Sequence, residues 1–233
     1  MTKFSAYRKW INEKFSEESD PIQDMGIGME HAINTWFEKS GRSYPNASSS
    51  AHSKLLACIS SNKPEFVSYL YRQAKKSITR SNYQDSDYLR YTIVYNNLEI
   101  LKILVEEGVD LNMSNGKFLV QACTKGNSLM VKFMIDHGAD VNLENSRAFY
   151  MTAKTDHVHI LQLLIDNGIQ LTPEVLSNSL ATACYNGKIK TAEFIIKLGA
   201  TVNSNLSRNL LYWKVKNRRI RIIKLLQKYK LIH

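Results

Sequence analysis

Apolar residues recur along residues 51–233 at the spacing of short amphipathic helices, and the pattern returns about every 30 residues. It is clearest in two stretches, NNLEILKILVEEGVDLN at 96–112 and GNSLMVKFMIDHGADVN at 126–142. In each stretch a turn residue opens a helix whose apolar residues lie three and four positions apart, and a glycine ends it. A motif repeated at a fixed period predicts an array of similar repeats.

Three columns of residues extend this register to six repeats. The opening turn falls at Asn62, Asn96, Gly126, Asp156, Gly187 and Asn217. The closing position falls at Ala74, Gly108, Gly138, Gly168, Gly199 and Tyr229. Seven positions before the opening turn stand Leu55, Leu89, Leu119, Phe149, Leu180 and Leu210. Because neither short helix of a repeat can bury its apolar stripe alone, the columns predict an all-α solenoid whose stacked repeats share one core.

Residues 1–50 and 74–88 depart from this register. Ser5 can cap a helix over 6–15, and Asp20 followed by Pro21 predicts a second helix that runs to Lys39. Both helices need cover for their apolar residues, so they form either a helical cap on the first repeat or a separate partner-binding module. Residues 42–50 predict a linker, and residues 74–88 predict an irregular loop where the interval between repeats lengthens to 34 residues.

The repeats resemble a known family. NLEILKILVEEG at 97–108, GADVN at 138–142 and GATVN at 199–203 are similar to the second helix and closing turn of ankyrin repeats. The resemblance covers about residues 51–233, behind an N-terminal module and linker at 1–50, and implies a protein-binding solenoid of about six helix-turn-helix units. We place the units at approximately 51–84, 85–114, 115–144, 145–174, 175–205 and 206–233.

Two departures from the ankyrin pattern shape the functional expectation. The usual Thr-Pro-Leu-His opening is nearly gone, and the period of about 30 is shorter than the ankyrin period of about 33. The shortening falls after Asn112 and Asn142, where ankyrin repeats carry a projecting hairpin, so these fingers should be clipped or absent. Such short repeats rich in Asn and Lys most resemble the ankyrin proteins of large DNA viruses, including giant viruses; a phage or an intracellular bacterium is the alternative source.

The ankyrin geometry implied by the resemblance places the partner-binding surface on the first helices. The residues expected on its concave side are Tyr91, Tyr95, Gln121, Lys125, Met151, Lys154, Tyr185, Tyr212 and Lys216. Tyr, Met and Lys together are typical of contact surfaces, because tyrosine offers a large area at a low cost in rotamer entropy. The competing interpretation is that these tyrosines only cover neighbouring helices.

Charge is distributed unevenly along the chain. The net charge is +10, but residues 194–233 hold ten lysines and arginines and no acidic residue, so the rest of the chain is neutral. This excess suits contact with an acidic protein, a solvated cap, or nucleic-acid binding aided by Tyr212, Trp213 and Tyr229. We define the basic end patch as Arg218, Arg219, Arg221, Lys224 and Lys228.

No pattern indicates catalysis, a cofactor or a metal site. Cys58, Cys123 and Cys184 match no metal-ligand spacing and predict buried free thiols in a reducing compartment. The only close histidine pair, His157 and His159, falls on a turn and the following helix. A charged start and the lack of a long apolar run lead us to expect a soluble, cytoplasmic protein that is not secreted.

These observations favour a non-catalytic scaffold, encoded by a virus, that engages or inhibits a host protein in the host cytoplasm through its concave face and its atypical ends. The alternative is nucleic-acid or polyanion binding led by the basic C-terminal repeat.

Overall fold

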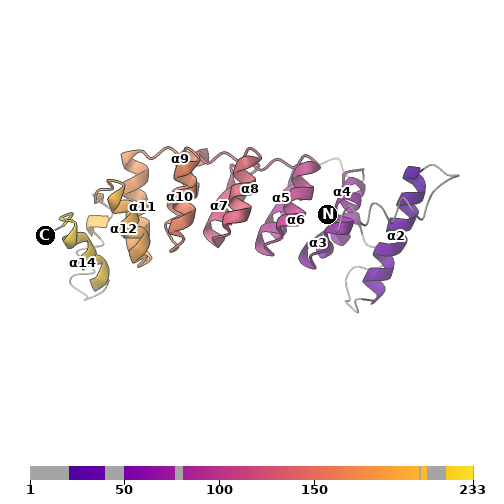
Figure 1. Cartoon of the computed structure of the whole chain (residues 1–233), viewed down its shortest axis with the longest axis horizontal. Helices are drawn as coiled ribbons and strands as arrows, with labels where there is room; N and C mark the ends of the chain where they lie inside the picture. Colours follow the sequence, from indigo (N-terminus) through magenta and orange to yellow (C-terminus); the bar gives the residue numbers. More distant parts are fainter. Residues whose placement is uncertain (1–20, 40–49, 77–80, 205, 209–218, 233) are drawn as a thin grey trace. The chain divides into compact units, whose positions relative to one another are not determined.

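Short helices joined by tight turns make up every regular element that the computed structural model describes, and none of the described residues forms a strand. The structure describes residues 21–39, 50–76, 81–204, 206–208 and 219–232. The chain divides into two compact units, residues 1–109 and 110–233, and Figure 1 labels the helices of both. The expected helix over 6–15 and most of the expected linker at 42–50 lie outside the described residues.

The first compact unit contains two helical hairpins and a preceding helix. Its helices are α2 (Pro21–Lys39), α3 (Ala51–Ser60), α4 (Pro64–Lys76), α5 (Ser81–Val94) and α6 (Leu98–Glu106). Helices α3 and α5, the first helices of their repeats, pack together, and so do the second helices α4 and α6. Leu55, Val67 and Leu101 are completely buried between them. The predicted start of α2 at Pro21 and its end at Lys39 are confirmed.

Helix α2 lies against the first repeat. The Trp36 ring packs edge-on against Phe37 and lies 6.2 Å from the Phe66 ring of α4, centroid to centroid. Lys54 Nζ of α3 donates to Asn34 Oδ1 at 3.2 Å. Ile33 and Phe37 are buried as a result, so α2 covers apolar surface that the first repeat would otherwise expose.

The second compact unit stacks its helices in two rows. The first helices are α7 (Lys117–Lys125), α9 (Leu143–Thr152) and α11 (Pro173–Tyr185). The second helices are α8 (Ser128–Asp136), α10 (Val158–Asp166), α12 (Ile189–Lys197) and α14 (Ile220–Lys228). Neighbours within each row pack directly on one another. The second helices bury the same position in each repeat, as Met134, Leu164 and Leu226 illustrate.

Left-handed backbone conformations mark most of the predicted turns. In the opening-turn column they occur at Asn62, Asn96, Gly126 and Gly187, and in the closing column at Gly108, Gly138, Gly168 and Gly199. Asn and Gly tolerate this conformation best, which is why both columns are so rich in them. Asp156 does not adopt it: α9 ends early, at Thr152, and the chain leaves it through turns closed by Thr155 Oγ1 donating to the Thr152 carbonyl at 2.7 Å.

Two predicted features of the repeats are wrong. The irregular loop at 74–88 is largely helical, because α4 continues to Lys76 and α5 begins at Ser81. Ala74 is buried and carries no stop signal, and the buried Tyr88 of α5 packs edge-on against Tyr71 of α4. In the last repeat Lys230, not Tyr229, takes the left-handed conformation, with φ 55°.

The described connections between repeats in the second compact unit contain no projecting hairpin. Ser114, Asn115 and Gly116 form a left-handed turn, and Glu144, Asn145 and Ser146 repeat it. Asn112 and Asn142 tie these connections together: Asn112 donates to the Gly138 carbonyl and accepts from Asp140 N, both at 2.8 Å. Asn142 makes the equivalent bonds to Gly168 and Gln170 at 3.3 and 2.7 Å. An asparagine ladder thus joins consecutive repeats where the finger would stand.

Candidate partner-binding surface

The end of α5 presents an ordered aromatic stack in the first compact unit. The rings of Tyr91 and Tyr95 stack with centroids 6.1 Å apart, and the Arg90 guanidinium lies 5.0 Å from the Tyr91 centroid. Asp87 holds Arg90 through an ion pair of 2.6 Å one helical turn away. Tyr95 is 47% exposed and the adjacent Val94 is 45% exposed. The Tyr91 ring is therefore held between the Arg90 guanidinium and the Tyr95 ring, and Tyr95 faces solvent.

In the second compact unit the expected contact residues lie at equivalent ends of three neighbouring first helices. Tyr185, at the end of α11, is 61% exposed. Lys125 and Lys154 are also exposed, whereas Gln121 and Met151 are half-buried. Tyr212 and Lys216 lie outside the described residues. Because α7 packs on α9 and α9 on α11, these side chains belong to one continuous row of helices.

The next repeat fixes the turns that carry these residues. In three places a side chain near the start of a second helix donates to a carbonyl at or just after the end of the first helix of the preceding repeat. These bonds run from Asn97 to Ile59 at 2.6 Å, from Thr191 to Thr155 at 2.7 Å, and from Arg219 to Tyr185 at 2.7 Å. A Cβ added at Gly187 would lie 2.2 Å from Arg219 Nη1, so the arginine can reach Tyr185 only across a glycine. The exposed tyrosine therefore stands on a backbone that is already ordered.

The basic end patch is arranged differently from the prediction. Arg218 lies outside the described residues, and Arg219 is committed to the Tyr185 carbonyl. Lys228 pairs with Glu193 of α12 at 3.4 Å, and Tyr229 donates to the same carboxylate oxygen at 2.8 Å. Among the four described residues of the patch, Arg221 and Lys224 are exposed cations that contact no carboxylate or carbonyl of the described part of the chain.

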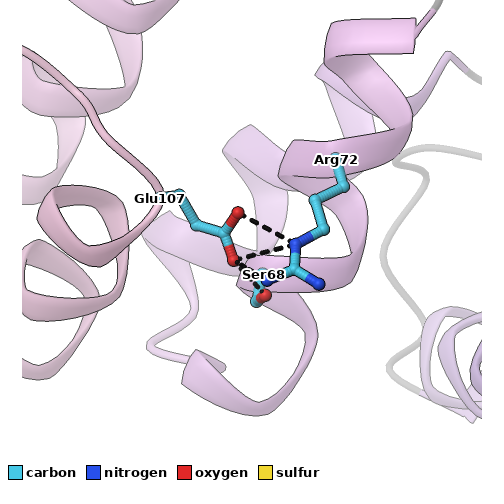
Figure 2. Close-up of polar contacts among 3 residues, drawn as sticks. All are labelled: Ser68, Arg72 and Glu107. Carbon is cyan, nitrogen blue, oxygen red and sulfur yellow. Dashed lines mark hydrogen bonds and ion pairs between the residues drawn. The ribbon is translucent and has the colours of Figure 1, made fainter.

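A carboxylate also joins two repeats in the first compact unit. Glu107, which follows α6, accepts from Arg72 Nε at 2.9 and 3.0 Å and from Ser68 Oγ at 2.5 Å (Figure 2). Desolvation alone would raise the pKa of Glu107, but the hydrogen bonds from Arg72 and Ser68 and the charge of Arg72 outweigh it and lower the pKa. We call this set the Glu107 clasp, and the contacts of Glu193 with Lys228 and Tyr229 the Glu193 clasp.

Sequence analysis did not identify Arg90 or the residues of the two clasps as functional. Arg90 precedes the contact column by one residue, and its only sequence signal is Asp87 three positions earlier on the same helix. Glu107 directly follows α6 and Glu193 lies within α12, and in sequence both are expected to be ordinary solvent-exposed residues. Their partners come from a neighbouring repeat about 35 residues away, which no local pattern identifies.

The described residues include all three cysteines of the chain. Cys58, Cys123 and Cys184 are free and buried, and burial raises the pKa of each thiol to about 12, which suppresses the reactive thiolate. No group of His, Cys, Asp and Glu in the described ranges is arranged to hold a metal ion. None of the described helices is long and apolar enough to cross a membrane.

Paired helices stacked in register, with glycine turns and asparagine bridges between them, define a helical repeat protein. The chain belongs to the ankyrin-repeat family: the family model described as ankyrin repeats (3 copies) matches residues 89–175 and 119–205, which together span half of the chain. Ankyrin repeats generally mediate protein–protein interaction, and proteins of this family are typically scaffolds and not enzymes.

Solved structures of ankyrin repeat domains are similar to this chain at low sequence identity. The ankyrin repeat domain of human ASB11 is similar at 19% identity and a TM-score of 0.48, covering 63% of this chain and 69% of that one. The ankyrin repeat domain of Bcl-3, described as a member of the IkappaB family, is similar at 16% identity and a TM-score of 0.51, covering 64% and 73%. No curated protein sequence matches the chain.

Proposed function

We propose that this chain is a non-catalytic scaffold that binds a partner protein through the ends of its first helices. The observation that carries the proposal is the stack of Arg90, Tyr91 and Tyr95, with the exposed Tyr185 as a second anchor. Rings held in place before binding lose little entropy on complex formation, and such aromatic anchors supply much of the energy of protein interfaces.

The remaining contact residues of this surface are Gln121, Lys125, Met151, Lys154, Tyr212 and Lys216. The absence of a projecting finger in the described connections supports a binding mode that uses helix ends and not hairpin tips. The resemblance of the short repeats to those of large DNA viruses supports a host protein, met in the cytoplasm, as the target that the chain occupies and inhibits.

Substitution of the anchors tests this proposal. The triple variant Tyr91→Ala, Tyr95→Ala and Tyr185→Ala should capture its partner from host-cell lysate at least about tenfold less well, because hot-spot truncations cost more than about 1 kcal/mol each. The matching triple Phe variant keeps the ring area and should retain most of the binding. A control variant, Lys102→Ala, Lys117→Ala and Gln162→Ala, removes exposed side chains elsewhere. Capture by the triple Ala variant at the wild-type yield would refute the proposal.

The N-terminal segment, residues 1–50, is proposed as a cap on the ankyrin-repeat domain at 51–233. The contact of Trp36 with Phe66 supports this role over a separate binding module. In Trp36→Ala a cap predicts a lower melting temperature with partner capture unchanged, when capture is measured below that temperature. A binding module predicts weaker partner capture with the melting temperature unchanged.

The competing function is binding of nucleic acid or another polyanion, which the exposed Arg221 and Lys224 favour. It predicts that the chain binds a 20-base-pair DNA duplex and loses that affinity by orders of magnitude between about 50 and 200 mM salt. Retention of the captured partner over the same salt range would argue for protein recognition.

A further inference from the structure

Helices α12 and α14 present a face of cations that the sequence register did not bring together. Its members are exposed lysine and arginine side chains, which we call the outer cation face: Lys190, Lys197, Arg221, Lys224 and Lys228. The opposite side of each helix is buried, with Ala192 and Ile195 on α12 and Ile222 and Leu226 on α14. The two helices pack side by side (Figure 1), so the five cations lie on adjacent helices.

The Glu193 clasp sets the register of this surface. Glu193 Oε1 lies 3.4 Å from Lys228 Nζ and 4.0 Å from Lys197 Nζ, which brings Lys197 of α12 beside Lys228 of α14. Both helices are nine residues long, so Lys190 occupies in α12 the position that Arg221 occupies in α14. On α14 the cations fall at i, i+3 and i+7, about 4.5 and 10.5 Å apart along the axis.

The charge of the outer cation face is not neutralised by the described part of the chain. Glu193 is its one carboxylate, and that group already serves Lys197, Lys228 and Tyr229. Lys190, Arg221 and Lys224 form no ion pair within the described ranges. A solvated cap requires polar residues but not one sign of charge, and adjacent like charges repel one another. An anionic partner would remove this repulsion.

We propose that the outer cation face binds an acidic helical segment of the partner protein. An α-helix that carries carboxylates at i, i+3 and i+7 has the same axial spacing as Arg221, Lys224 and Lys228, so its charges can pair in register with α14. The inference rests on the proposed protein-binding function and assigns it a second surface, distinct from the tyrosine anchors.

The aromatic side chains beside the outer cation face argue against single-stranded nucleic acid as the ligand. Tyr229 is engaged through its hydroxyl by Glu193, and Lys228 Nζ lies 5.3 Å from its ring centroid. Phe194 is half-buried on α12. Single-stranded nucleic acids stack their bases on open aromatic faces, whereas Lys228 lies over the Tyr229 ring and Phe194 is half-buried. Four of the five cations are lysines, which are point charges and lack the planar fork with which arginine binds phosphate bidentately.

Fluorescence anisotropy with a defined probe tests the assignment. The probe is a labelled 21-residue helical peptide with Glu at i, i+3 and i+7 along one face, compared with the same peptide carrying Gln. The full chain should bind the Glu peptide at least tenfold more tightly than the Gln peptide. The variant Arg221→Glu, Lys224→Glu should lose at least tenfold in affinity for the Glu peptide. The control Lys102→Glu, Lys117→Glu changes the net charge equally and should bind like wild type.

Each other outcome overturns the inference. Equal loss in the two charge-reversed variants would show attraction to net charge alone, and tighter binding of a 20-base-pair DNA duplex than of the Glu peptide would show a nucleic-acid surface. Circular dichroism confirms that each variant is folded. Capture of the native partner separates the two proposals: loss in the triple Tyr→Ala variant with no loss in Arg221→Glu, Lys224→Glu would leave the proposed function standing and refute the outer cation face.

Discussion

The repeats from α7 to α12 and the last repeat, of which the structure describes α14, are held by different interactions. The former have glycine at every closing turn, and Asn112 and Asn142 bridge their connections. The last repeat has Lys230 at its closing turn and depends on polar contacts, with Arg219 reaching back to Tyr185 and Glu193 reaching forward to Lys228 and Tyr229.

This difference follows from how many neighbours a repeat has. An inner repeat buries both sides of its helices, so apolar packing and backbone bridges suffice. A terminal repeat has one neighbour, and each side chain that crosses to it carries more of the contact. The Glu107 clasp, which joins α6 to the first repeat, uses the same device as the Glu193 clasp, but its carboxylate is less exposed, at 13% against 32%. Polar clasps thus occur in both compact units, the Glu107 clasp between α4 and the end of α6 and the Glu193 clasp between α12 and the end of α14.

The largest expected effect is a difference in unfolding between substitution of a leucine in an inner repeat and substitution of a leucine in the last repeat. Leu161 of α10 and Leu226 of α14 are both completely buried. Leu161→Ala should lower the free energy of unfolding by about 2–5 kcal/mol, because it leaves a cavity between two neighbours. Leu226→Ala should instead release α14 alone, seen as faster hydrogen exchange confined to residues 220–228 while the main urea transition stays in place. A single transition shifted equally by both variants would show that the last repeat is not separable.

The asparagine ladder gives the next largest effect. Asn112→Ala removes the bonds to Gly138 and Asp140 and should cost about 1–2 kcal/mol in urea unfolding. Asn142→Ala should cost slightly less, because its bond to the Gly168 carbonyl is longer. Gln162→Ala is the control: its amide bonds only to Asp166 within α10, so the change should stay within about 0.5 kcal/mol. Equal effects at Asn112 and Gln162 would mean that the ladder does not join the repeats.

The Glu107 clasp ranks third. Glu107→Gln should lower the stability by about 1 kcal/mol at pH 7, through loss of the charge-assisted bonds from Arg72. Because the pKa of Glu107 is lowered, the contribution is present above the carboxyl's ordinary pKa of about 4.3 and is lost as the pH falls through its value in the folded protein. Wild type and variant should therefore converge as the pH falls below the pKa of Glu107 in the folded protein. The neighbouring, exposed Glu106→Gln serves as the control and should shift the melting temperature little.

The sequence predicted the fold to the extent that each turn carries its own signal. Gly108, Gly138, Gly168 and Gly199 mark turns that only small or permissive residues enter, and the structure confirms all four. The predicted loop at 74–88 was wrong because no local signal ends α4. The helices that replace it are joined by the contact of Tyr71 with Tyr88, which depends on how two repeats pack. A pattern of single residues cannot register that contact.

For the candidate site, the sequence predicted where residues lie on their helices but not which side chains contact one another. The turn register located Tyr95 and Tyr185 at helix ends, where they are exposed. It could not indicate that Arg219 would leave the basic end patch for the Tyr185 carbonyl, or that Lys190 and Lys197 would join the exposed cations of α14. Those outcomes depend on side-chain reach across an interface between repeats, and the relevant partners are separated by about 30 residues in sequence.

The smallest expected effect is a gain of stability at the closing turn of the last repeat. Lys230 is exposed and has a φ of 55°, which costs a non-glycine residue about 1 kcal/mol, whereas the inner repeats place glycine at this turn. Lys230→Gly should therefore slow hydrogen exchange in α14 by about two- to fivefold, equivalent to about 0.5–1 kcal/mol. Lys230→Ala removes the same charge without relieving the backbone and should not slow it. If the two variants behave alike, the charge and not the turn limits the last repeat, and the contrast with the inner repeats would lie in electrostatics alone.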